Sequence, residues 1–208
     1  MRSLVRIIIN TIFPLTVHGK LLGPITPEQF VRHYSILPVH STITLSRYHT
    51  PVIQAAIAAC KFENNLHAAV LLATLPATWI STHQSTGTTI LIPLPLSQAR
   101  QKERRFNQVE RVLIHIQKNP TVRIERHWLK RTIDTARQTS LDRRARLKNM
   151  TGAFTSGDAI TTIDWSDISR VIICDDVLTT GATLAAAKAA LLPHLPARVE
   201  LICLAFAH

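Results

Sequence analysis

The chain has 208 residues, of which 46% are hydrophobic, and its 24 Lys and Arg residues against 13 Asp and Glu residues give a formal net charge of +11. This length and apolar content predict one globular domain with a sizeable core and a small appendage, and exclude a disordered chain. No apolar run approaches the roughly 20 residues that a membrane-spanning helix needs, so we expect no membrane insertion.

Hydrophobic periodicity predicts alternating helices and strands. A short apolar run over residues 5–9 is loosely similar to a signal peptide, but its length favours a helix packed on the body. After it, in chain order, we expect helices over residues 51–62 and 66–75, a strand over 88–91, helices over 109–117 and 140–148, a strand over 168–174, a helix over 184–192 and a strand over 199–205.

Strands separated by helices predict an α/β fold, in which a parallel sheet with right-handed crossovers is flanked by helices. A ligand is then expected at the carboxyl ends of the strands. We assign residues 1–47 to an N-terminal appendage and residues 48–208 to the ligand-binding domain.

Residues 171–183 are the most informative segment and read Val-Ile-Ile-Cys-Asp-Asp-Val-Leu-Thr-Thr-Gly-Ala-Thr. Threonine hydroxyls and backbone N–H groups around Gly181 suit a phosphate at a helix N-terminus, where the helix dipole favours an anion. Asp175 and Asp176 suit ribose hydroxyls and a hydrated Mg²⁺ instead. The segment therefore predicts a site for a ribose 5-phosphate, and an ordinary strand-to-helix turn with a capping threonine is the alternative.

These thirteen residues resemble the phosphoribosyl pyrophosphate (PRPP) motif of type I phosphoribosyltransferases at every position. The resemblance implies a type I phosphoribosyltransferase-like fold that binds PRPP with Mg²⁺, with Asp175 and Asp176 as the catalytic carboxylates that hold the metal through water. The PRPP-binding residues that it implies are Asp175, Asp176, Val177, Leu178, Thr179, Thr180, Gly181, Ala182 and Thr183.

Three further segments resemble the ComF/GntX family, and the resemblance covers roughly residues 48–206. They are Lys61-Phe62 at the end of a helix, Ile92-Pro93-Leu94-Pro95 followed by Arg100 and Arg104-Arg105-Phe106-Asn107-Gln108, and Arg131, Thr135, Gln138, Leu141, Arg146, Asn149 and Gly152-Ala153-Phe154. The resemblance implies a cytoplasmic protein associated with natural competence, the uptake of DNA and its use in transformation.

The same resemblance implies two groups of residues around the pyrophosphate. Pro93, Leu94, Arg104 and Arg105 belong to the loop that binds it, and Arg131, Arg146 and Asn149 belong to a hood that closes over PRPP. The alternatives are that the prolines only end a strand and that residues 131–149 form a permanently solvated loop.

The chain departs from the family at two places. Arg105 stands where the family usually has glycine, which tests whether that position needs a positive φ. ComF proteins often begin with a four-cysteine zinc module, whereas the first cysteine here is Cys60, so we expect no structural zinc. The three cysteines, Cys60, Cys174 and Cys203, lie in apolar runs and are expected to be buried thiols.

Most of the excess positive charge lies between Arg100 and Lys148. It predicts an anionic partner, which is pyrophosphate, nucleic acid or both. Phe106 and Trp128 are the only aromatic candidates there, so base stacking is poorly supported and salt-sensitive backbone binding to single-stranded DNA is the form left open.

Two functions stay open from the sequence. The first is a ComF-like competence protein that binds PRPP with Mg²⁺ and also single-stranded DNA, or a DNA-uptake helicase or recombination protein. The second is an active phosphoribosyltransferase that transfers ribose 5-phosphate from PRPP to a nucleobase or another small acceptor. Catalysis in such a site is mostly positioning and charge stabilisation, so no diagnostic nucleophile need be present. A scaffold with a vestigial site is disfavoured because both carboxylates and the glycine are intact.

Overall fold

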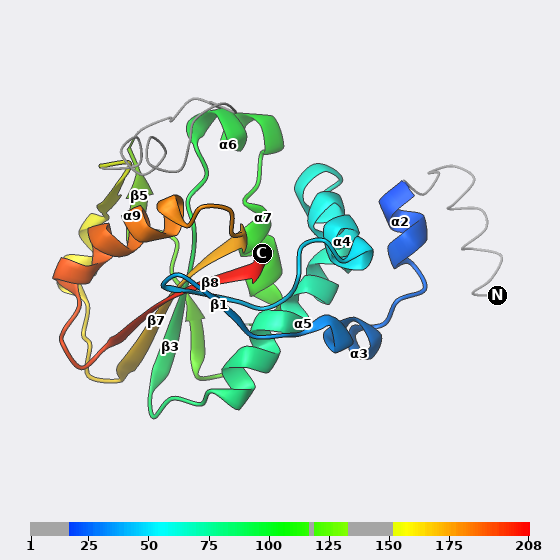
Figure 1. Cartoon of the computed structure of the whole chain (residues 1–208). Coiled ribbons are helices and arrows are strands. Elements are labelled where there is room, and N and C mark those ends of the chain that lie inside the picture. Colours follow the sequence, from blue (N-terminus) through cyan, green and yellow to red (C-terminus); the bar gives the residue numbers. More distant parts are fainter. Residues whose placement is uncertain (1–16, 117–118, 133–151) are drawn as a thin grey trace.

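A six-stranded sheet forms the centre of the computed structural model, which describes residues 17–116, 119–132 and 152–208. The strand order is β1-β2-β8-β7-β3-β4, and all neighbours are parallel except β1 and β2. Helices cover both faces of this sheet (Figure 1). The strands are β1 (Leu37–Val39), β2 (Thr42–Thr44), β3 (Thr88–Pro93), β4 (Val122–Ile124), β7 (Ile168–Val177) and β8 (Glu200–Ala207), and a separate antiparallel ribbon consists of β5 (Leu129–Arg131) and β6 (Phe154–Ser156).

The helices include most of those that the periodicity predicts. They are α2 (Val17–Leu22), α3 (Pro27–Phe30), α4 (Pro51–Phe62), α5 (Leu66–Thr82), α6 (Gln98–Arg104), α7 (Gln108–Leu113) and α9 (Ala182–Leu191), with 3₁₀ turns at Val31–His33, Ile114–Ile116, Asp158–Thr162 and Leu192–His194. The predicted α/β class with a mainly parallel sheet flanked by helices is confirmed.

The central strand β7 supplies side chains to two cores, one on each face of the sheet. Ile172 and Cys174 pack into the core shared with α4, α5 and α7, and Val171 and Ile173 pack into the core shared with α9 and the β5–β6 ribbon. A strand that is buried on both faces needs an apolar side chain at successive positions, which explains the unbroken apolar run before the carboxylates.

Three predicted elements end three or more residues away from their observed ends, and the other elements that differ do so by only one or two residues. Helix α5 continues past Pro76 to Thr82. The proline costs the helix one backbone hydrogen bond, and burial of Trp79 and Ile80 beyond it offsets that loss. Helix α7 ends at Leu113 and passes into a 3₁₀ turn. Strand β7 extends three residues further than predicted, since its pairing with β8 continues as far as Val177 opposite Ala207.

The hairpin of β1 and β2 joins the sheet through parallel pairing of β2 with β8, and no sequence pattern predicts it. The predicted helices over residues 5–9 and 140–148 lie outside the described residues. The boundary between an appendage and the ligand-binding domain at residues 47 and 48 stays a prediction. Within the described ranges, no helix combines the length and the apolar character required to cross a membrane.

Candidate functional site

Asp175 and Asp176 are neighbours near the end of β7, where only Val177 follows them. Because side chains alternate along a strand, the two carboxylates point to opposite faces of the sheet. Asp176 is 7% exposed and points to the face of α4 and α7. There its Oδ2 lies 3.0 Å from Lys61 Nζ and accepts a hydrogen bond of 2.7 Å from Gln108 Nε2. Asp175 is only partly buried, and its Oδ1 accepts the backbone N–H of Asp176 at 2.8 Å. The two neighbouring carboxylates therefore have different surroundings.

The threonine turn leads directly from this strand end into α9. Gly181 has φ +76° and precedes the first residue of the helix, so the turn needs a residue that adopts the left-handed conformation without strain. The N–H of Leu178 donates to the carbonyl of Ala207 at 2.8 Å, which fixes the start of the turn to β8. Thr179 is exposed and Thr180 is partly buried. The order of carboxylates, hydroxyls and helix N-terminus predicted for residues 175–183 is present in space as well as in sequence.

His40 lies beside this turn, although no sequence pattern assigns it to the site. It occupies the two-residue turn between β1 and β2 with φ +55°, and its Cδ2 is 3.8 Å from the position that a Cβ on Gly181 would take. The two residues are far apart in the chain, and only the pairing of β2 with β8 brings them together. A local sequence pattern carries no signal for such a contact.

The proline loop after β3 packs against the residue that precedes the acidic pair. Pro93 is paired with Cys174, and the N–H of Leu94 donates to the Cys174 carbonyl at 2.9 Å. The Leu94 carbonyl accepts a 3.0 Å hydrogen bond from Asn107 Nδ2, and the Asn107 side chain also caps α7. The structure thus brings Pro93 and Leu94 next to the strand end that carries Asp175.

Arg104 and Arg105 end α6, in the connection between β3 and α7. Arg104 donates through NH1 to Gln108 Oε1 at 2.9 Å, which connects it to Asp176 through the Gln108 amide. Arg105 caps the helix with φ +63°, so this position does adopt a positive φ although it carries a side chain. Its side chain is exposed.

The predicted hood is described only in part. The guanidinium of Arg131 lies 5.4 Å from the ring of Phe154, its partner across the β5–β6 ribbon, which packs against α9. Arg146 and Asn149 lie outside the described residues.

The carboxyl group of Asp175 holds its proton more tightly than an ordinary aspartate does. Burial, followed by the neighbouring Asp176 carboxylate, raises the pKa of Asp175 to about 7. An added cation would favour the ionised form, and carboxylate oxygens are ligands that suit a hydrated Mg²⁺. Of the two predicted metal-holding carboxylates, Asp175 is thus the one placed to hold Mg²⁺, because the Asp176 side chain points to the other face of β7 and is paired with Lys61. No cluster of three or more His, Cys, Asp or Glu side chains suited to a metal occurs in the described part of the chain.

The cysteines are buried free thiols, as predicted. Burial raises the pKa of Cys60 to about 12 and that of Cys203 to about 11, and it also raises the pKa of Cys174. Thiols in this state are poor nucleophiles, so none of the three is a candidate for covalent catalysis.

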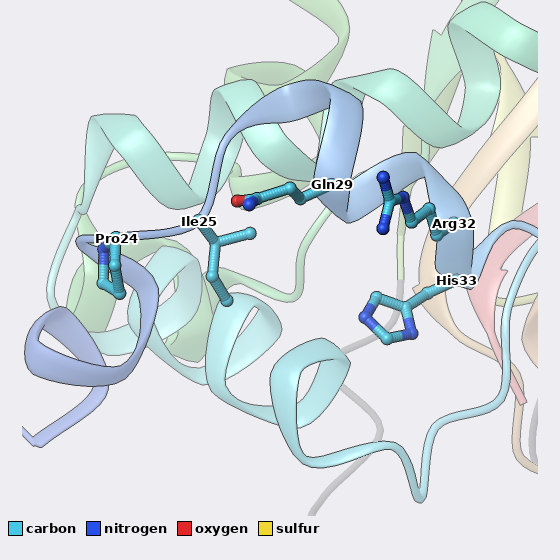
Figure 2. Close-up of a pocket in the computed structure, with 5 residues that line it drawn as sticks. All are labelled: Pro24, Ile25, Gln29, Arg32 and His33. Atoms are coloured by element: carbon cyan, nitrogen blue, oxygen red, sulfur yellow. The ribbon is translucent and has the colours of Figure 1, made fainter.

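A surface hollow of about 460 Å³ lies in the N-terminal part of the described chain (Figure 2). Its lining residues come from α3 and the segments on either side of it: Pro24, Ile25, Gln29, Arg32 and His33. None of the predicted site residues lines this hollow.

Comparison with known protein families bears on the segment that contains β7, the threonine turn, α9 and β8. Residues 139–208 match the family model of the phosphoribosyl transferase domain. Together with the mainly parallel sheet, this match supports a type I phosphoribosyltransferase-like fold. Domains of that family generally use PRPP with Mg²⁺. No curated protein matches the chain.

The raised pKa of Asp175 predicts how its replacement by asparagine changes stability with pH. Between pH 3.8, the ordinary pKa of aspartate, and about pH 7, Asp175 keeps its proton in the folded state but has lost it in the unfolded chain. Asp175 therefore makes the wild type less stable as pH rises through this window. Asp175→Asn removes that effect. The free energy of unfolding of the variant, relative to wild type, should therefore increase by up to about 1.4 kcal/mol per pH unit in this window.

Urea denaturation of the ligand-free protein at a series of pH values measures this difference. Asp164→Asn is the matched control. Hydrogen bonds from Ser166 lower the pKa of Asp164, so the free energy of unfolding of this variant relative to wild type should not rise with pH. If the free energy of unfolding of Asp175→Asn relative to wild type stays constant between pH 3.8 and about 7, the raised pKa of Asp175 is contradicted.

Proposed function

We propose that the chain is a ComF-like protein that binds PRPP with Mg²⁺ where β7 passes into the threonine turn. The observation that carries the proposal is the position of a half-buried carboxylate, Asp175, next to a glycine turn that starts α9, inside the segment that matches the phosphoribosyl transferase domain. In this assignment the 5-phosphate binds the backbone and hydroxyls of residues 179–183, and the ribose hydroxyls face Asp175.

The remaining site residues surround the pyrophosphate in this proposal. Pro93 and Leu94 bring backbone groups to the same sheet edge, and α6 carries Arg104 and Arg105 towards it. Mg²⁺ bound with PRPP would neutralise the pyrophosphate and favour its departure. The hood with Arg131, Arg146 and Asn149 would exclude water, and residues 48–208 would form the ligand-binding domain with residues 1–47 as its appendage.

An active phosphoribosyltransferase is the second function that this site supports. Its geometry would place C1 of the ribose between the carboxylates and the pyrophosphate loop, so that an acceptor could displace pyrophosphate through an oxocarbenium-like state. The acceptor would be a nucleobase or another small molecule.

Binding of single-stranded DNA, and with it a role in natural transformation in the cytoplasm, is the further part of the proposal. The net charge of +11 and the exposed cations of α6 support it. Part of the basic stretch is neutralised within the protein, because Arg123 pairs with Asp167, Arg126 with Glu110 and Lys130 with Asp158. The cations in α6 and at its C-cap, Lys102 and Arg105 among them, are therefore the better candidates for phosphate contacts. A DNA-uptake helicase or a recombination protein would be the protein partner.

Replacing both carboxylates tests the PRPP site. Asp175→Ala combined with Asp176→Ala should abolish Mg²⁺-dependent binding of PRPP in calorimetric titration, and Asp175→Asn alone should weaken it about 10- to 100-fold, since a hydrogen bond to a charged group contributes about 1.5–3 kcal/mol. Asp164→Asn, an exposed carboxylate before β7, should leave the affinity unchanged. Equal affinity of wild type and the double variant would refute the site.

Release of pyrophosphate separates the accessory protein from the enzyme. With wild-type protein, PRPP, Mg²⁺ and a panel of nucleobases, the accessory function predicts tight binding and no acceptor-dependent release. Turnover with a defined acceptor would instead establish the phosphoribosyltransferase.

Salt dependence tests the binding of DNA. Affinity for a single-stranded oligonucleotide, followed by fluorescence anisotropy, should fall steeply with salt, and a substitution that removes one cation from a phosphate should reduce the logarithmic slope by about 0.7. Lys102→Gln should reduce this slope, whereas Arg123→Gln, which removes a cation paired with Asp167, should change it less. An affinity that does not respond to salt would contradict binding through phosphates.

A further inference from the structure

Lys61 forms an ion pair inside the candidate site, at the end of α4. Its Nζ lies 3.0 Å from Asp176 Oδ2, and the two side chains are only 19% and 10% exposed. A lysine is seldom so buried without a partner, because removing its ammonium group from water is costly. The carboxylate of Asp176 is therefore paired with a cation that belongs to the protein itself.

The same carboxylate oxygen has a second donor from another helix. Gln108, which is 4% exposed at the start of α7, donates through Nε2 to Asp176 Oδ2 at 2.7 Å, and its Oε1 accepts from Arg104 NH1 at 2.9 Å. The arginine can only donate, so it determines which end of the Gln108 amide faces Asp176. Asp176 is thus oriented by two helices before any ligand binds.

The negative charge of Asp175 and Asp176 affects how the site can bind an anionic ligand. Two adjacent carboxylates repel a polyanion such as PRPP, and a divalent cation is the usual means of neutralising such a pair. Lys61 already offsets one of the two negative charges. Asp175, on the opposite face of β7, is left for the sugar and its metal.

We propose that Lys61 is a positioning residue and a permanent counter-ion for Asp176, so that the site needs no metal beyond the Mg²⁺ that arrives with PRPP. This inference depends on the proposed PRPP function and specifies how its charge is balanced. Lys61 acts through Asp176: it fixes the carboxylate and supplies the charge that a second metal ion would otherwise provide.

Calorimetric titration of PRPP at a series of Mg²⁺ concentrations tests this role in the full-length protein. Lys61→Met should weaken PRPP binding about tenfold or more at low Mg²⁺, and added Mg²⁺ should recover much of the affinity because metal then neutralises Asp176. Lys61→Arg, which keeps the positive charge, should retain most of the wild-type Mg²⁺ dependence.

A double variant keeps the test decisive if Lys61→Met folds poorly. Lys61→Met with Asp176→Asn removes both charges of the pair, so it should regain both thermal stability and a low requirement for Mg²⁺. An identical Mg²⁺ dependence in wild type and Lys61→Met, or a double variant no better than the single one, would overturn the role of Lys61. Failure of the wild type to bind PRPP at any Mg²⁺ concentration would instead refute the proposed function itself.

Discussion

The register of β7 between β3 and β8 is the constraint on which the candidate site depends. In a strand, neighbouring side chains point to opposite faces, so a shift of one residue would exchange the surroundings of Asp175 and Asp176. Apolar side chains on both faces of β7 and pairing on both edges prevent such a shift. As a result one carboxylate meets the cation of Lys61, and the other shares the face of α9 with the threonine turn.

The same register aligns the loops that surround the acidic pair. The N–H of Leu94 donates a hydrogen bond to the carbonyl of Cys174, and the N–H of Leu178 donates one to the carbonyl of Ala207 at the end of β8. Backbone hydrogen bonds of this kind position the proposed pyrophosphate loop and the threonine turn relative to the carboxylates without any ligand. An arrangement fixed in advance is what binding of a flexible polyanion requires, since less ordering is then left to the binding step.

The parts of the site that can be predicted from the sequence are those encoded by local patterns. The apolar run of β7, the carboxylates at its end and Gly181 in a left-handed turn follow from residue type and spacing. The segment around Arg105 resembles one that usually has glycine at this position, which raises the question of a positive φ there, and the structure has one. Burial of the cysteines follows from the apolar residues around them.

Features that depend on contacts between distant segments cannot be predicted in this way. The strands of the β1–β2 hairpin have three residues each, too few for a clear periodicity, and its turn reaches Gly181 only because β2 pairs with β8. Lys61 lies near the end of a predicted helix, but its ion pair with Asp176 joins two elements more than a hundred residues apart, which no local pattern encodes. Pro76 favours an end to α5 by local preference, and buried side chains beyond it override that preference.

A crystal structure of the protein with PRPP and Mg²⁺ would be the decisive measurement. We expect density for the 5-phosphate against the backbone amides of residues 179–183, with the ribose hydroxyls towards Asp175 and Lys61 still bound to Asp176. Crystals grown at saturating PRPP in which this strand edge holds no ligand, or in which PRPP lies elsewhere on the protein, would contradict the assignment.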